Sequence, residues 1–357
     1  MRGCGGTYAR GQGQAAAAAL IVLLAAAILL ALSPGPAAAS AGGIVSHELD
    51  AGGSSFFSTG FSRAQIRRAK PLPLPELDVP AARAASTAST ATAEPSGKPG
   101  YVEGTLPAGA AIGSAALQAG ASARGFGKFS SDAVADPTVF PNTTNGKVIG
   151  KIKGIGLYSC SASVVHAKNR NTIFTAGHCV KEPGGRFASK LAFAPAYSDG
   201  AAPLGAWTGK RALVPKAWTV GNNNYDYAAV AMKPSHGRKL EKLTGSKGFA
   251  YNIPVKRKNF RAVGYPFNKD RTNTMWECVS GFGGYDPGYR GGPGPSPFGI
   301  GCDMSSGASG GGWTVPGEYL ASVSSFTYDQ LPNRLFGPRF SKAADRLRAA
   351  AGRFKVG

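Results

Sequence analysis

Acidic residues, cysteine and histidine are all scarce in this chain of 357 residues. It has 19 Asp and Glu against 40 Lys and Arg, together with five Cys and four His. The excess of basic residues predicts a surface that attracts polyanions. The sequence has no Cys-x-x-Cys pair of the kind that holds zinc, no recognition helix and no aromatic RNA-binding motif. We therefore expect no metal, no organic cofactor and no specific nucleic-acid partner, and we interpret the basic surface as promoting solubility and adhesion to acidic cell-envelope polymers.

A single long apolar run is present, and it lies near the amino terminus. Residues 15–32 are apolar, follow Arg2 and Arg10, and precede a stretch of small residues that includes Ala39. This order is typical of a secretory signal peptide, here 1–41, that is cleaved on export. Retention as a membrane anchor is the alternative, because 18 apolar residues just span a bilayer. In both cases the protein is predicted to be secreted or held at the cell surface.

The region 42–130 differs in composition from the rest of the chain. It is rich in Ala, Ser, Pro and Gly and has no sustained helical or strand period. This composition predicts a pro-segment or linker that is largely disordered, within which residues 61–70 could form a short basic helix. From 131 to 357, short runs of Val, Ile, Phe and Tyr alternate with Gly, Pro and Asn. That spacing predicts an all-β domain, either a sandwich or a barrel.

One serine stands among small residues in "GASGGGW", residues 307–313. Glycine permits tight turns and close approach of the backbone to a ligand, so this stretch is either a flexible loop or a turn that presents a nucleophile. In the second case Ser309 would attack an acyl group. The backbone amides of Gly307 and Ser309 would form an oxyanion hole for the oxygen that becomes negative. Such a site requires a base and an orienting acid elsewhere in the chain.

All four histidines precede Ser309. This order excludes the nucleophile elbow of α/β-hydrolases, in which the histidine follows the serine, and it leaves the chain order His, Asp, Ser. His178 is the favoured base because it follows the strand-like run "TIF" in "TIFTAGHCV" and has small neighbours. The alternatives have weaker contexts: His47 lies in the low-complexity region, His166 precedes a polar loop, and His236 lies in a basic turn.

The acid that orients such a histidine has to be close to a buried strand, and Asp226 fits this requirement. It stands in "GNNNYDYAAVAM", where an Asn-rich turn leads into an apolar run that we expect to be a buried strand. An ordinary turn aspartate is the alternative. Asp199, Asp270 and Asp286 lie in loops without a following buried strand.

Three motifs in this order, "TAGHC", "YDYAAV" and "GASGG", resemble those of the chymotrypsin-like serine peptidases, in particular a bacterial exported branch related to glutamyl endopeptidases. The resemblance covers about 139–352. It implies two six-stranded antiparallel β-barrels with the active site in the cleft between them, and a carboxy-terminal helix. Residues 341–352, "SKAADRLRAAAG", suit that helix because a serine can cap its start and a glycine stands at its end.

The resemblance also implies roles for individual residues. His178 would be the general base, Asp226 its orienting partner and Ser309 the nucleophile, and the substrates would be proteins or peptides. Four exported cysteines allow three pairings. Of these, the resemblance implies Cys160 with Cys179, which leaves Cys278 with Cys302.

Several positions depart from the family pattern. Ala308 stands where many animal relatives have an aspartate that receives the new amino terminus on activation, so that ion-pair switch cannot operate here. Asp303 lies six residues before Ser309, the spacing at which trypsin-like enzymes place their specificity carboxylate. Ser324 stands where glutamate-specific members have a histidine, and Phe326 could flank the substrate backbone.

These observations together predict a secreted, monomeric serine endopeptidase that acts through an acyl-enzyme. The alternative from another class is a catalytically weak relative that binds acidic cell-surface polymers. An esterase using the same three residues is a further alternative, because acyl transfer to water uses the same groups.

Overall fold

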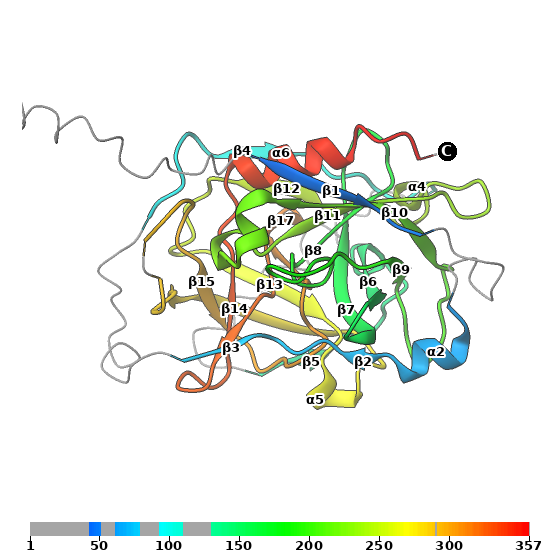
Figure 1. The fold of residues 1–357 in the computed structure, drawn as a ribbon, viewed down its shortest axis with the longest axis horizontal. Helices are drawn as coiled ribbons and strands as arrows, with labels where there is room; N and C mark the ends of the chain where they lie inside the picture. Colours follow the sequence, from blue (N-terminus) through cyan, green and yellow to red (C-terminus); the bar gives the residue numbers. More distant parts are fainter. Residues whose placement is uncertain (1–42, 51–60, 79–92, 110–129, 290, 357) are drawn as a thin grey trace, which may run out of the picture. The chain divides into compact units, whose positions relative to one another are not determined.

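The computed structural model describes residues 43–50, 61–78, 93–109, 130–289 and 291–356. The predicted signal peptide, 1–41, lies outside these residues. No helix in the described ranges is long and apolar enough to cross a membrane. Strands dominate these ranges, as expected for an all-β chain, and they form two large sheets (Figure 1).

The first sheet closes into a six-stranded barrel. Its strands follow the order β10-β11-β8-β7-β6-β9, and β9 pairs again with β10. Every neighbouring pair around this ring is antiparallel. The interior is filled by side chains such as Val148, Phe174, Phe193 and Val230, all fully buried. The strands are β6 (Asn145–Ile152), β7 (Gly156–Val165), β8 (Thr172–Thr175), β9 (Lys190–Pro195), β10 (Trp207–Pro215) and β11 (Ala228–Met232).

The second sheet contains the downstream strands in the order β19-β15-β14-β13-β16-β17-β12. Phe260, Phe298 and Trp313 pack in its core, with ring centroids between 5.0 and 6.4 Å apart. Large aromatic rings therefore supply much of the buried apolar surface on this side. The strands are β12 (Gly248–Tyr251), β13 (Asn259–Gly264), β14 (Trp276–Tyr285), β15 (Phe298–Gly301), β16 (Gly312–Val315), β17 (Tyr319–Val323) and β19 (Arg334–Gly337), with β18 (Thr327–Tyr328) beside β19.

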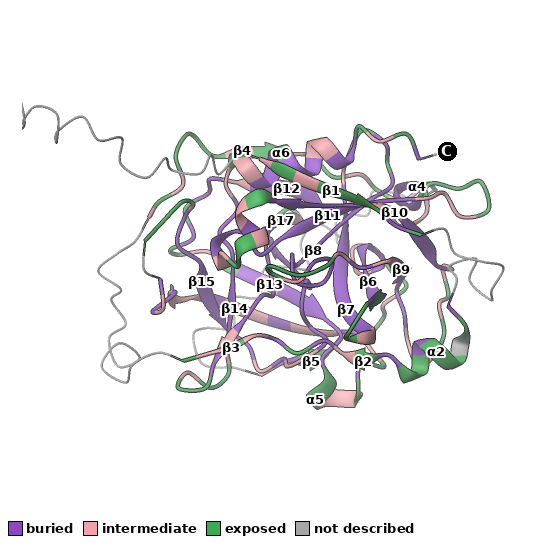
Figure 2. Cartoon of the chain, in the orientation of Figure 1, coloured by how far each residue is buried: buried purple, intermediate pink, exposed green. Residues whose placement is uncertain are grey.

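The predicted carboxy-terminal helix is confirmed as α6 (Lys342–Ala351). The Ser341 hydroxyl accepts a hydrogen bond from the Ala343 amide at the start of the helix, and Gly352 is the carboxy-terminal cap. Leu347 and its small neighbours pack against the core of the first barrel. Figure 2 shows the inner face of this helix buried and its outer face less so. The remaining helical turns are short: η1 (Asn142–Thr144), η2 (Lys216–Val220), η3 (Asn223–Tyr225), α4 (Leu240–Thr244) and α5 (Phe267–Asp270).

The described parts of the region 42–130, for which the composition predicts a largely disordered pro-segment or linker, contain short strands and one helix. They add strands to both sheets, and backbone pairing with an existing sheet edge orders them even where their own apolar content is low. Helix α2 (Arg63–Arg68) confirms the predicted short basic helix, and Ser62 and Gln65 form a capping box at its start. The added strands are β1 (Ile44–Glu48) on β10, β2 (Lys70–Pro71) on β7, β3 (Glu76–Leu77) on β18 and β4 (Gly100–Val102) on β12; β5 (Asp132–Ala133) then pairs with β14.

Two disulfides join the cysteines in the pairing that the resemblance implied. Cys160 on β7 bonds to Cys179 in the turn after β8, and Cys278 on β14 bonds to Cys302 just after β15. The second bond closes a loop with a sequence separation of 24 residues, rich in Gly and Pro. Without the bond this loop would gain much conformational freedom in the unfolded chain.

We expect the double substitution Cys278→Ala and Cys302→Ala to lower the free energy of unfolding by about 3 kcal/mol, because the unfolded loop is no longer constrained. Equilibrium denaturation monitored by tryptophan fluorescence measures this loss. The single variants should lose a similar amount, since either one breaks the same bond. An unchanged unfolding free energy in all three variants would contradict the expectation.

Candidate active site

Two neighbouring strands of the first barrel bring His178 and Asp226 together. His178 lies in the turn after β8, and Asp226 immediately follows η3, just before β11. Strands β8 and β11 pair antiparallel, with Thr175 opposite Ala228. The end of one strand therefore lies beside the start of the other, and residues separated by 48 positions in the sequence meet at one edge of the barrel.

The Asp226 carboxylate accepts three hydrogen bonds in a buried setting. The His178 ring Nδ1 lies 2.7 Å from Oδ2, and the His178 backbone amide donates to Oδ1 at 2.8 Å. The Ser325 hydroxyl donates to Oδ2 as well. Asp226 and His178 are 1% and 7% exposed. Because the Asp226 carboxylate accepts a hydrogen bond from Nδ1, the neutral form of the imidazole has its proton on Nδ1 and a lone pair on Nε2.

The turn that carries His178 has little room for larger side chains. A Cβ atom at Gly177 would come within 2.9 Å of Asp226 Oδ1 and of the Trp218 ring. The Trp218 indole donates to the Lys181 carbonyl at 2.9 Å, and its ring centroid lies 6.4 Å from that of His178. Trp218 therefore packs beside the histidine and the aspartate, and a glycine at 177 is required for that close approach.

Ser309 lies on a tight turn between β15 and β16 that is bonded to both halves of the domain. Gly307 and Gly310 adopt φ angles of +90° and +78°, a region that favours glycine. The Ser309 carbonyl accepts from the Ser161 amide on β7 at 2.8 Å, and the Gly310 amide donates to the Ser324 carbonyl at 2.8 Å. These bonds fix the turn in position between the two sheets.

Ser309 Oγ and His178 Nε2 are both buried, and neither has a hydrogen-bond partner among the described residues. The Gly307 amide donates at 3.1 Å to a backbone carbonyl, that of Leu72 in the upstream region. This amide is thus oriented to bind a carbonyl oxygen. The arrangement combines a serine hydroxyl, an imidazole with one free lone pair, and an amide donor directed at an oxygen, which are the elements of acyl transfer.

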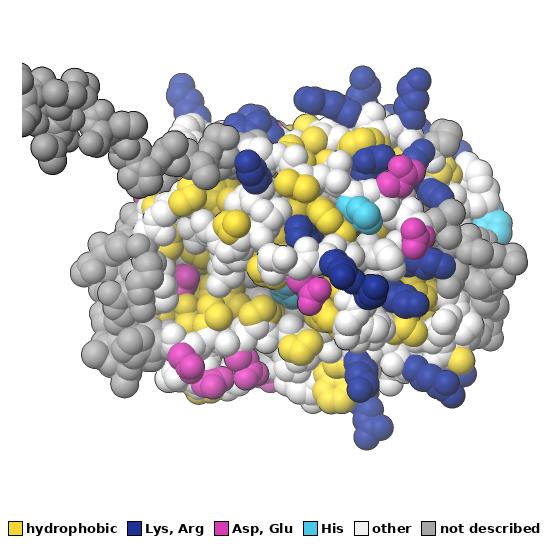
Figure 3. All heavy atoms as spheres, in the orientation of Figure 1, with side chains coloured by type: hydrophobic (Ala, Val, Ile, Leu, Met, Phe, Trp, Pro, Cys, Tyr) yellow, Lys and Arg dark blue, Asp and Glu magenta, His cyan; other side chains and the backbone are white. Residues whose placement is uncertain are grey.

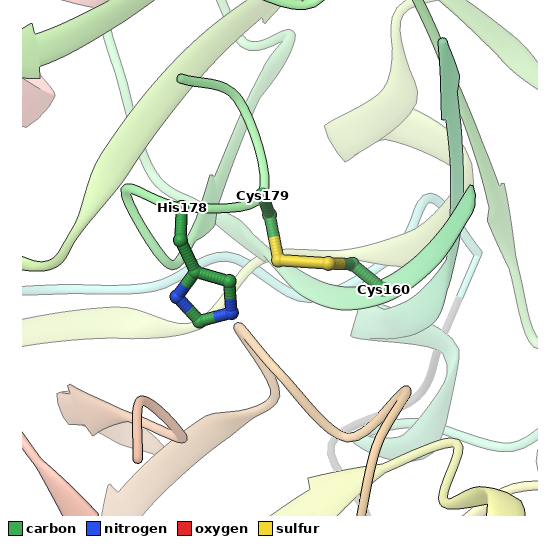
Figure 4. Close-up of side chains that lie close together, drawn as sticks. All are labelled: Cys160, His178 and Cys179. Carbon is green, nitrogen blue, oxygen red and sulfur yellow. A yellow bond between two sulfur atoms is a disulfide. The ribbon is translucent and has the colours of Figure 1, made fainter. Parts of the chain in front are cut away.

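One cluster of potential metal ligands includes the candidate base. The ligand atoms of Cys160, His178 and Cys179 lie within 4.8 Å of one another, and Figure 4 shows the imidazole beside the two sulfurs. Those sulfurs are joined to each other in a disulfide. Metal binding by cysteine requires thiolates, so this cluster does not fit a metal ion.

The specificity candidates have partners within the protein. Ser131 donates to Asp303 Oδ1 from both its amide and its hydroxyl, at 2.8 and 2.7 Å, and Lys269 Nζ lies 2.6 Å from Oδ2. Burial raises the pKa of Asp303, but the hydrogen bonds from Lys269 and Ser131 outweigh it and hold that pKa below its ordinary value. Ser324 is buried, and its hydroxyl accepts from the Trp313 indole at 3.0 Å.

Phe326 is buried and stacks on Phe336 with ring centroids 5.5 Å apart. It adjoins Ser325, the residue that hydrogen-bonds Asp226. Sequence reasoning missed Ser325, Gly177 and Trp218. Ser325 carries no signal that separates it from its neighbour Ser324 in "VSSF", because only the pairing of distant segments decides which hydroxyl reaches the carboxylate.

Comparison with known proteins places the chain in a family. No model of a known protein family matches the chain. Two of the solved structures to which the chain is similar are covered over nearly their whole length. One is the thermostable serine protease AL20 from an extremophilic microorganism, with 31% identity and TM-score 0.53, covering 59% of this chain and 97% of that one. The other is the protease Anisep from Arthrobacter nicotinovorans, with 30% identity and TM-score 0.56, covering 62% and 99%. The chain belongs to the chymotrypsin-like serine peptidases.

One further solved structure shares the fold at lower sequence identity, and two curated proteins match over a shorter part of the chain. The structure of a Glu endopeptidase in complex with MPD shares the fold at 20% identity and TM-score 0.51. The glutamyl endopeptidase of Bacillus licheniformis is 29% identical over 121 residues, and the extracellular metalloprotease of Bacillus subtilis is 36% identical over 120 residues. Each match covers 33% of this chain and 36% of the relative, so the chain spans about a third of the length of these two relatives.

A buried amine, that of Lys147, lies close to the turn that carries Ser309. Lys147 on β6 is 3% exposed, and its Nζ donates to the Thr272 carbonyl and hydroxyl at 2.8 and 3.0 Å. Thr272 in turn lies against Gly307, since a Cβ atom at Gly307 would come within 2.7 Å of the Thr272 methyl group. Burial lowers the pKa of Lys147 to about 8, although the Asp270 carboxylate acts in the opposite direction.

Between pH 8 and 10 we expect the free energy of unfolding of the unsubstituted protein to rise relative to that of the Lys147→Met variant. Unfolded lysine has a pKa of about 10.4, so in this window the unfolded chain binds a proton that the folded chain has released. Below pH 8 both states are protonated, and the buried charge destabilises the fold. The expected gain is roughly 1–2 kcal/mol, measured by urea denaturation at each pH. Lys151→Met, at an exposed position on the same strand, should show no such pH-dependent difference; equal behaviour of the two variants would contradict the expectation.

Proposed function

We propose that this protein is an exported serine endopeptidase in which His178, Asp226 and Ser309 form the catalytic triad. The main support is the buried pair of His178 and Asp226, with Nδ1 2.7 Å from Oδ2 and a free Nε2. The membership of the family and the position of Ser309 on a glycine turn support the same assignment. Protein or peptide substrates follow from that membership.

The mechanism uses each of these groups in turn. Ser309 Oγ attacks the substrate carbonyl carbon while His178 Nε2 takes its proton, and Asp226 stabilises the imidazolium that forms. The amides of Gly307 and Ser309 donate to the oxyanion. His178 then gives its proton to the leaving amine, and water releases the acyl group by the reverse sequence. Ser325 holds the carboxylate that orients the imidazole, so we assign it as a positioning residue.

We do not propose that Asp303 or Ser324 selects substrates by the charge of their side chains. Lys269 and Ser131 already neutralise and hydrogen-bond the Asp303 carboxylate, and the Ser324 hydroxyl is committed to Trp313. A structural role for both residues fits these contacts better than a role in binding a charged substrate side chain. The name of the Bacillus licheniformis relative, glutamyl endopeptidase, is therefore not extended to the specificity of this chain.

Export is supported by the amino-terminal signal and by the name of the Bacillus subtilis relative, an extracellular protease. The net charge of +21 supports an attraction to acidic cell-envelope polymers. Figure 3 shows Lys and Arg side chains around much of the visible face, with fewer acidic ones. In this proposal the basic surface localises the enzyme and does not replace catalysis.

Fluorophosphonate labelling of the folded protein tests the nucleophile. We expect a single adduct on Ser309, located by peptide mass analysis and lost in Ser309→Ala. Asp226→Asn should slow labelling by a factor of about 10⁴, because the imidazole then adopts the wrong tautomer. A folded protein that never labels, with its amino-terminal segment removed, would contradict the assignment.

Ser325→Ala tests the positioning role. The carboxylate loses one hydrogen-bond donor, and we expect kcat for peptide hydrolysis to fall about tenfold with KM little changed, since bonds to charged groups contribute about 1.5–3 kcal/mol. Ser325→Thr should restore most of the activity because it keeps the hydroxyl. Ser324→Ala is the matched control, and an equal loss in both alanine variants would contradict a specific role for Ser325.

A further inference from the structure

Residues 70–77, "KPLPLPEL", form an extended stretch that we call the cleft segment. It begins as β2, paired with β7 of the first barrel, and ends as β3, paired with β18 beside the second sheet. The Leu72 amide donates to the Ser159 carbonyl at 2.9 Å, and the Thr327 amide donates to the Pro75 carbonyl at 3.0 Å. In Figure 1 the stretch runs from β2 to β3 past the ends of both sheets.

The middle of the cleft segment lies at the candidate active site. The Leu72 carbonyl accepts the Gly307 amide at 3.1 Å, so it occupies one of the two donors assigned to the oxyanion hole. A Cβ atom at Gly307 would come within 3.3 Å of the Pro71 side chain. Ser309 is 0% exposed in this state. A nucleophile has to be reached by its substrate, and here it is covered.

The side chains of the cleft segment alternate as in a strand that covers a surface. Leu72 and Leu74 are 7% and 4% exposed, whereas Pro73 between them is exposed. Leu72 belongs to the buried cluster that includes Cys160 and Cys179, and Leu74 to the one that includes Met304. The segment thus places one leucine into each half of the domain. Its prolines restrict the free chain, which lowers the entropy lost on docking.

The direction of the cleft segment is opposite to the one that catalysis requires. In the proposed mechanism the leaving nitrogen lies against His178 Nε2. The Cys160–Cys179 disulfide ties the His178 turn to β7, so the substrate chain after that nitrogen continues on the β7 side. The cleft segment does the reverse: it starts at β7 and proceeds toward β18. Consistent with this reversal, it pairs parallel with both strands. A substrate running in the opposite direction would pair antiparallel with them.

We propose that residues 70–77 are a built-in inhibitor that fills the active site in the reverse direction of a substrate, so that it blocks Ser309 without being cleaved. The proposal rests on the proposed function, because it describes regulation of the same site. Such an inhibitor would keep the unprocessed chain inactive as a zymogen. This form of inactivity does not depend on the activation aspartate that many animal relatives have at the position of Ala308. Release requires removal of the cleft segment or its displacement from both β7 and β18.

The test compares the rate of fluorophosphonate labelling at Ser309 between the unsubstituted chain and variants of the cleft segment. Intact-mass measurement first verifies that each chain still contains residues 70–77. In the double variant Leu72→Asp and Leu74→Asp, buried carboxylates disfavour docking, and we expect labelling at least tenfold faster than in the unsubstituted chain. Pro73→Asp adds a charge at an exposed position of the same segment, and its labelling rate should stay that of the unsubstituted chain. Leu72→Ala with Leu74→Ala keeps the test valid if the charged variant does not fold, and it should give a smaller increase.

The outcomes separate this proposal from the proposed function. Rapid labelling of the unsubstituted, unprocessed chain, equal to that of the leucine variants, would overturn the inhibitor while leaving the peptidase intact. A folded leucine variant that never labels would overturn the peptidase and the inhibitor together. Intact-mass measurements after long incubation should find no cut within 70–77, and a cut there would show that the segment binds as a substrate.

Discussion

The buried Asp226 carboxylate is the constraint on which the rest of the site depends. A charge that is removed from water requires hydrogen bonds or a counter-charge. Here it receives one bond from the His178 backbone, one from the His178 ring and one from Ser325. These donors come from the first barrel and from the segment after β17, so satisfying one carboxylate fixes how the two halves of the domain meet at this point.

The turn that carries Ser309 also lies where the first barrel and the second sheet contact each other. Ser309 is followed by β16 in the second sheet, yet its carbonyl is bonded to Ser161 on β7 of the first barrel. Positive φ angles at Gly307 and Gly310 allow the chain to reverse tightly enough for this contact. The Cys160–Cys179 bond then ties β7 to the His178 turn. His178 and Ser309 are therefore held by independent connections to one strand, which limits their relative movement.

The described residues upstream of 130 pair with strand edges of the downstream domain. Pairing β2 with β7 and β3 with β18 satisfies backbone groups at strand edges that would otherwise be open. Proline-rich sequence suits this position because it remains extended without forming a helix. A segment whose composition alone indicates disorder is thus ordered by the domain it covers.

The sequence by itself was sufficient for the strand-rich domain and the carboxy-terminal helix, and it led to the proposal of His178, Asp226 and Ser309 as the triad. Each of these depends on local signals: short apolar runs between turn residues, a serine cap, and motif order along the chain. Only the tertiary structure decided that Ser325 and not Ser324 reaches Asp226, that Asp303 is paired with Lys269, and that the Leu72 carbonyl accepts the Gly307 amide. Those facts depend on strand register and on contacts between segments far apart in sequence, and a shift of one residue along a strand turns each side chain to the opposite face.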